Sequence, residues 1–229
     1  MRTKLIGFLL LLPLFYGCKM ATSVKPETTG PEPEPYQVTR DSVTSGDYLG
    51  IAINEEAASV YTKIQNLQLI KGITALNVVN NVFSDLTSLK EQLPLYQYIL
   101  LDQKPGSDSG VQITVEKQVV KAIYLNSGKQ LTQWPEKQPN NSSVRLGDPV
   151  SSLYEKLVSI KAIKQFTNKF EYISLLTKNL SANYDLGMSR SPQWYFGYST
   201  GVDQMDQIQV YFQNGKVTKL YIDHYAKYK

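Results

Sequence analysis

Very few residues in this sequence could carry out covalent or acid–base chemistry. The 229 residues include one cysteine, Cys18, and one histidine, His224. The sequence therefore supplies almost no residues from which a nucleophilic Ser-His or Cys-His pair, or a metal site built on histidine, could form. Glu55 and Glu56 are adjacent, but the start of a helix accounts for acidic residues at that place. The sequence predicts a protein that is not an enzyme and binds no metal or cofactor, and His224 is interpreted as an exposed tail residue.

Cys18 is suited to a different modification, the attachment of lipid. Two basic residues precede an apolar run from Leu5 to Leu14, which is too short to span a bilayer and is typical of a secretory signal. The run ends in Leu14-Phe15-Tyr16-Gly17-Cys18, which resembles the lipobox of bacterial lipoproteins. We expect residues 1–17 to be a lipoprotein signal peptide and Cys18 to carry lipid as the first mature residue. The alternative is a plain signal peptide that happens to contain a cysteine.

Charge and composition argue against a nucleic-acid partner. The 24 Lys and Arg residues are balanced by 20 Asp and Glu residues, a net charge of +4, and the two signs are interspersed along the chain. Proteins that follow phosphate backbones instead concentrate basic residues on one face. The 16 tyrosines are the unusual component, and tyrosine supplies contact area with little rotamer entropy to lose. No feature indicates a small-molecule substrate, so the composition favours a protein partner of unknown identity.

The chain carries two copies of one pattern. Asn214-Gly215 lies between two runs of β-branched and aromatic residues and can adopt the positive φ angles of a type I′ turn, so Ile208–Ile222 is predicted to form a hairpin. A similar segment lies 97 residues earlier, at Val111–Leu125. The helical pattern that begins at Val150 likewise matches one that begins 93 residues earlier, at Ala57. The sequence therefore indicates an internal duplication.

Each copy is predicted to contain two helices followed by three or four antiparallel strands. Apolar spacing places the second helix of each copy at 84–94 and at 168–180. The predicted fold is α+β, with two tandem copies of a helix-turn-helix packed on a three- to four-stranded antiparallel sheet. The predicted domains are a signal peptide (1–17), a disordered proline-rich tether (18–47), repeat 1 (48–128), a linker (129–143) and repeat 2 (144–229).

The start of the second copy carries a short motif. Val144-x-Leu146-Gly147-Asp148-Pro149-x-x-x-Leu153 opens the helical segment, and a Trp194-Tyr195-Phe196 strand and the tight hairpin follow it. This arrangement resembles the SmpA/OmlA (BamE-like) small outer-membrane lipoproteins. Two such units in tandem resemble the β-lactamase inhibitor protein fold, in which the sheet faces not covered by helices form a concave protein-binding surface. The resemblance implies a lipid-anchored protein of the cell envelope, at the outer membrane of a Gram-negative bacterium.

Alternation along the predicted strands separates a buried face from an open face. Ile208, Val210 and Phe212 fall on one face of their strand, and Tyr211 falls on the other. If helices cover the apolar face, tyrosines remain on the open faces, and aromatic anchors among polar residues are typical of protein recognition. The candidate protein-binding residues are Tyr98, Tyr124, Tyr195, Tyr211, Lys219 and Tyr221, with Tyr98/Tyr195 and Tyr124/Tyr221 as equivalent pairs. The alternative is that these tyrosines pack against the linker, the sister sheet or a second molecule.

Two functions fit these features. One is a lipid-anchored module that captures or inhibits another protein on its open sheet faces. The other is a structural component of an outer-membrane complex, as BamE-like proteins are, with contacts made by helices and termini.

Overall fold

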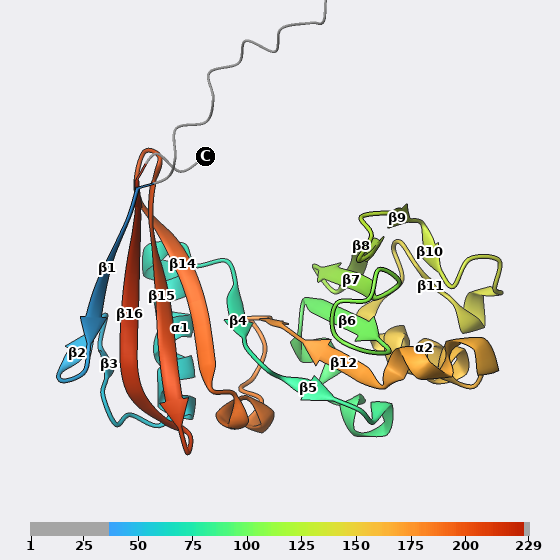
Figure 1. The fold of residues 1–229 in the computed structure, drawn as a ribbon, viewed down its shortest axis with the longest axis horizontal. Coiled ribbons are helices and arrows are strands. Elements are labelled where there is room, and N and C mark those ends of the chain that lie inside the picture. Colours follow the sequence, from blue (N-terminus) through green and yellow to red (C-terminus); the bar gives the residue numbers. More distant parts are fainter. Residues whose placement is uncertain (1–36, 227–229) are drawn as a thin grey trace, which may run out of the picture. The chain divides into compact units, whose positions relative to one another are not determined.

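Strands predominate in the computed structural model, which describes residues 37–226 (Figure 1). Over this range the chain forms sixteen strands in four sheets, two α-helices and six 3-10 helices. The predicted α+β fold with a helix-turn-helix in each copy is therefore wrong, because the chain is mostly β. The predicted signal peptide and Cys18 lie outside the described residues.

The first large sheet, here called sheet I, has six antiparallel strands. Their order is β1 (Gln37–Val43), β16 (Lys216–Ala226), β15 (Gln204–Gln213), β14 (Gln193–Gly201), β4 (Leu76–Val78) and β13 (Thr177–Lys178). Helix α1 (Ala57–Lys71) lies along one face of this sheet (Figure 1). It begins beside the β15–β16 turn, where the Ala57 N–H donates to the Gly215 carbonyl at 2.8 Å.

The second large sheet, called sheet II, also has six strands, and α2 (Leu153–Lys161) is the second α-helix. The strand order of sheet II is β5 (Val82–Phe83), β12 (Tyr172–Leu175), β6 (Tyr98–Asp102), β7 (Val111–Glu116), β8 (Val119–Leu125) and β9 (Gln130–Leu131). Two small sheets pair β2 (Asp47–Tyr48) with β3 (Ile51–Ala52) and β10 (Gln133–Trp134) with β11 (Val144–Arg145). The 3-10 helices are Leu86–Leu89, Leu93–Leu95, Asn140–Ser142, Val150–Ser152, Lys164–Phe170 and Leu186–Arg190.

Both predicted hairpins are present. Strands β15 and β16 are joined by Asn214 (φ 51°) and Gly215 (φ 74°) alone. Strands β7 and β8 are joined in the same way by Lys117 (φ 48°) and Gln118 (φ 65°). Positive φ at both central positions is the conformation of a type I′ turn, so the first copy adopts the predicted turn without glycine.

The helix of each copy joins the sheet of the other copy. In the first copy, the Asn54 N–H donates to the Val217 carbonyl of β16 at 2.8 Å. At the equivalent place in the second copy, the Gly147 N–H donates to the Val120 carbonyl of β8, also at 2.8 Å. Strand β4 likewise pairs with β14, and β12 pairs with β6. In each copy, the helix and the strand paired above (β4 or β12) therefore join the sheet that is built by the last three strands of the other copy.

The second predicted helix of each copy is not formed. Residues 84–94 hold only short 3-10 turns, and residues 168–180 hold the end of a 3-10 helix and all of β12 and β13. In β12, Ile173 and Leu175 are fully buried and their neighbours half-buried, which is the period of two of a strand. Because β12 pairs with both β5 and β6, the sheet supplies partners for its backbone that override the helical spacing of the apolar residues.

Strand β1 corrects the predicted extent of the tether, which was expected to continue to residue 47. Its seven residues pair along β16, with Gln37 opposite Ala226 and Val43 opposite Leu220. Thr39 to Ser42 are exposed, so burial of side chains contributes little to this pairing. Similarly, β9, β10 and a 3-10 helix fall within 129–143, where a linker was expected.

Most apolar positions paired by the duplication lie in the core, although Leu146 is 40% exposed. Leu153 of α2 and Leu220 of β16 are both fully buried, as are Val60 and Ile64 of α1. No helix within residues 37–226 is long and apolar enough to cross a membrane.

Candidate functional site

Sheet I has one face packed on the core and one that carries polar and aromatic side chains. Ile208, Val210 and Phe212 of β15 are at most 8% exposed, as the alternation predicts. Gln209 and Tyr211, between them, are half-buried on the opposite face. The name tyrosine face is used below for this side of sheet I, with Tyr195, Tyr211, Lys219 and Tyr221.

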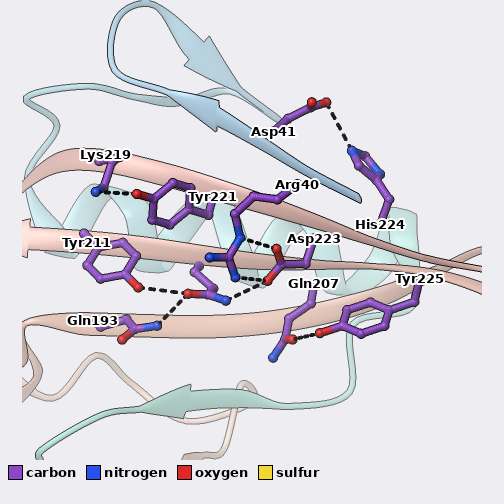
Figure 2. Close-up of polar contacts among 11 residues, drawn as sticks. Arg40, Asp41, Gln193, Gln207, Tyr211, Lys219, Tyr221, Asp223, His224 and Tyr225 are labelled. Carbon is purple, nitrogen blue, oxygen red and sulfur yellow. Dashed lines mark hydrogen bonds and ion pairs between the residues drawn. The ribbon is translucent and has the colours of Figure 1, made fainter. Parts of the chain in front are cut away.

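Three predicted binding residues meet on the tyrosine face, near the β15–β16 turn (Figure 2). The rings of Tyr211 and Tyr221 are edge to face, with centroids 5.6 Å apart. The Lys219 ammonium lies 4.3 Å from the Tyr221 centroid and 5.3 Å from the Tyr211 centroid, and it donates to the Tyr221 hydroxyl at 2.8 Å. The ring quadrupoles stabilise the cation. No carboxylate in residues 37–226 forms an ion pair with Lys219, so most of its hydrogen-bonding capacity is left for a ligand.

Polar residues that the sequence prediction missed extend this cluster across three strands (Figure 2). The Oε1 atom of Gln209 accepts hydrogen bonds from the Tyr211 hydroxyl at 2.9 Å and from Gln193 Nε2 at 3.1 Å. Its Nε2 atom donates to Asp223 Oδ2 at 2.8 Å. Period two would have placed Asp223 on the same face as Lys219 and Tyr221, and Gln209 beside Tyr211. The face is therefore a connected network rather than a set of isolated tyrosines.

Arg40 of β1 closes the network at the edge of the sheet. Its guanidinium holds the buried Asp223 carboxylate in a two-pronged ion pair, with Nε at 2.5 Å from Oδ1 and Nη2 at 2.8 Å from Oδ2. The guanidinium also lies 4.8 Å from the centroid of Tyr221. These bonds lower the pKa of Asp223 and raise the pKa of Arg40. The negative charge of Asp223 is thereby compensated within the sheet.

The remaining predicted residues are not part of this cluster. Tyr195 lies on the same face, on β14 opposite Gln209, one row away from Tyr211. Tyr98 and Tyr124 are half-buried on sheet II. Burial raises the pKa of Tyr98.

The strand register also corrects one predicted equivalence. Tyr98 pairs with Thr114, whereas Tyr195 pairs with Gln209. Since Thr114 is the counterpart of Tyr211 in the hairpin, Tyr98 corresponds to Gln193 and not to Tyr195. The equivalence of Tyr124 and Tyr221 is confirmed, because each stands opposite the matching glutamine of its hairpin. The two copies therefore present different aromatic patterns on their open faces.

His224 is not an exposed tail residue but part of β16. Its Nδ1 atom lies 2.7 Å from Asp206 Oδ1, and its Nε2 atom lies 3.2 Å from Asp41 Oδ2 of β1. The hydrogen bond to Asp206, with that to Asp41, raises the pKa of His224. Asp206 also accepts hydrogen bonds from the hydroxyls of Tyr198, at 3.0 Å, and Tyr48, at 3.4 Å. This arrangement ties β1 to the sheet.

A buried lysine forms a second polar cluster that the sequence did not indicate. Lys178 is fully buried, with the rings of Tyr61 and Tyr96 at 5.3 and 5.7 Å from its Nζ atom. Its Nζ donates only to two backbone carbonyls, at 3.3 and 3.4 Å. Desolvation lowers the pKa of Lys178 to about 8, although the nearby Asp185 opposes this change. Because its ammonium is enclosed by aromatic rings and bonded to backbone carbonyls in the core, we interpret Lys178 as structural.

Residues 37–226 contain no group of three or more His, Cys, Asp and Glu side chains placed to hold a metal ion. Comparisons with protein-family models, with curated proteins and with solved structures found no match to the chain. The candidate site therefore has to be interpreted from its own geometry.

Proposed function

We propose that the chain is a non-enzymatic, lipid-anchored protein of the cell envelope that captures another protein on its open sheet faces. The observation that carries this proposal is the cluster of Tyr211, Lys219 and Tyr221 on the tyrosine face. Tyrosine rings held in place by neighbours lose little entropy on binding and commonly act as hot spots at the centre of interfaces. Gln209, which is bonded to Asp223, holds the Tyr211 hydroxyl, and the Arg40 guanidinium lies over the Tyr221 ring.

The charges of the cluster define the partner more closely. Asp223 is compensated by Arg40, whereas Lys219 has no carboxylate partner among the described residues. A partner that presents an acidic side chain between the two tyrosine rings would complete the coordination of the Lys219 ammonium. Such a charge contributes to the rate of association and its salt dependence more than to affinity itself.

The test is to isolate the partner from solubilised envelope and then measure its affinity for purified variants. Tyr211→Ala and Tyr221→Ala should each weaken binding by about 2 kcal/mol or more, roughly thirtyfold. Asn66→Ala, at an exposed position of α1, is the matched control and should leave affinity unchanged. Circular dichroism should show that each variant is folded.

A second candidate function is that of a structural component in an outer-membrane assembly, with contacts on the helix side. Leu186 favours this second function, because its side chain is 81% exposed and lines a cavity of about 740 Å³ together with Tyr184 and Phe212. If the tyrosine variants bind like wild type while Leu186→Ser loses the partner, the tyrosine-face proposal is overturned and the assembly role takes its place.

A further inference from the structure

The most exposed apolar side chains are concentrated at one end of sheet I. Among the large hydrophobic residues of the described chain, four are more than two-thirds exposed: Val202 (91%), Leu69 (87%), Leu186 (81%) and Ile70 (74%). Val202 lies in the turn between β14 and β15, and Leu69 and Ile70 lie in the last turn of α1. Leu186 lies elsewhere, beside Gly215.

Strand pairing and helix direction place the first three at the same end. Helix α1 begins beside Gly215 of the β15–β16 turn and runs along the sheet away from that turn (Figure 1). At the other end of the helix, the Lys71 ammonium lies 5.1 Å from the ring centroid of Tyr198. Tyr198 belongs to β14 and precedes Val202, in the following turn, by four residues. Leu186, beside Gly215, is therefore at the opposite end of the sheet.

Both ends of the described chain also lie there. Gln37, where β1 begins, pairs with Ala226 of β16, and Ala226 pairs with Gln204, two residues after Val202. The chain thus enters the sheet at the end that carries the exposed apolar residues. The residues of the sequence that precede Gln37 include Cys18, and those that follow Ala226 are Lys227-Tyr228-Lys229.

We infer that this end of sheet I docks on a lipid surface, with Leu69, Ile70 and Val202 entering the head-group region. Apolar side chains that enter the interface, with basic residues beside them, add to the membrane binding that covalent lipid supplies. Lys71 supplies a positive charge at this end, while Asp203, in the same turn as Val202, opposes attraction to anionic lipid. The inference rests on the anchoring part of the proposed function in one respect: lipid at Cys18 would hold this end of the sheet near the membrane.

The test uses the chain from Pro35 to Lys229, which forms a compact unit of its own and lacks both Cys18 and the apolar signal segment. Its partitioning onto vesicles of phosphatidylethanolamine with phosphatidylglycerol is measured by co-sedimentation. We expect the wild-type chain to bind and the Leu69→Ser/Ile70→Ser double variant to lose about tenfold in partition coefficient. Val202→Ser should lose roughly threefold.

Leu186→Ser is the matched control, because Leu186 is as exposed but lies at the opposite end, and it should change partitioning by less than about twofold. Failure of the wild-type chain to bind vesicles, or an equal loss in Leu186→Ser, would overturn the inference. Self-association abolished by the double variant, without vesicle binding, would assign this end to a second copy instead. Because the tested chain carries no lipid, its result is independent of Cys18 modification and of partner binding through the tyrosine face.

Discussion

The two copies contain the same ion pair in different surroundings, which allows a controlled test of the fold. In the second copy, Lys156 Nζ lies 2.6 Å from Asp148 Oδ2 and 2.9 Å from Asn140 Oδ1. In the first copy, the equivalent Lys63 Nζ lies 2.5 Å from Glu55 Oε1. The Lys156 side chain is 11% exposed, and that of Lys63 is 40% exposed. We therefore compare Lys156→Met with Lys63→Met, two substitutions that remove the same charge and keep the length of the side chain.

The burial of each pair determines the expected cost. Removal of one partner of a buried pair usually costs about 3 to 5 kcal/mol, because an uncompensated charge remains. Asp148 would keep the Arg145 N–H as a hydrogen-bond donor, at 2.6 Å, so we expect the lower limit, about 3 kcal/mol, for Lys156→Met. The Lys63 ammonium is more exposed, so solvent screens its charge more, while the Glu55 carboxylate left behind is as buried as Asp148 and keeps the Ala52 N–H as a donor. Lys63→Met should therefore cost less than Lys156→Met, about 1 to 2 kcal/mol.

The assay is urea denaturation followed by circular dichroism, with the free energy of unfolding extrapolated to zero denaturant. A double-mutant cycle that adds Asp148→Asn isolates the coupling between Lys156 and Asp148. The reasoning is refuted if Lys63→Met and Lys156→Met destabilise the protein equally, or if the cycle shows no coupling in the second copy. Either result would mean that the burial of the second pair does not control its contribution to stability.

Three further predictions concern titration and turn geometry. Lys178→Met should raise the melting temperature at pH 7, because the lowered pKa of Lys178 means that its buried charge destabilises the fold. The gain should shrink as the pH rises above 8, because the folded chain then releases a proton that the unfolded chain still binds. A loss of stability at pH 7 would contradict this prediction. His224→Gln should destabilise the protein below about pH 6.5, and the difference should diminish as pH rises through the raised pKa of His224; a difference independent of pH would refute the ion pairs. Gly215→Ala should cost about 1 kcal/mol in urea unfolding, since φ is +74° and only the backbone conformation opposes a Cβ; an unchanged stability would exclude the type I′ geometry.

The hairpins and the buried face could be predicted from the sequence because their signals are local. Asn214-Gly215 and the alternation around it specify a turn and two faces without reference to the rest of the chain. The helix predicted at 168–180 failed because Ile173 and Leu175 fit both a strand and a helix over so short a segment. Only pairing with β5 and β6, which are remote in sequence, decides between them.

The exchange of helices between the copies could not be predicted from the duplication. The contact between Asn54 and Val217 and that between Gly147 and Val120 are equivalent. The same residues would serve if each helix packed on the sheet of its own copy, so the sequence pattern is compatible with both arrangements.

The part of the candidate site that lies on one hairpin could be predicted, because side chains along a strand alternate between its two faces. Tyr211, Lys219 and Tyr221 follow from alternation along one hairpin, and the structure brings them together. Arg40 was missed because composition assigns it to a tether, and only pairing of β1 with β16 places it beside Asp223. Pairing between remote strands is not encoded in the local sequence.

The central claim is that the partner binds on the tyrosine face, and site-specific photo-crosslinking tests it even while the partner is unidentified. A photoreactive phenylalanine analogue is placed at Tyr195 or Tyr221 on the face, and at Asn66 on the exposed side of α1, in cells that make the chain. One adduct of defined mass is expected from both tyrosine positions, and none from Asn66. Adducts from Asn66 alone, with none from Tyr195 or Tyr221, would contradict it.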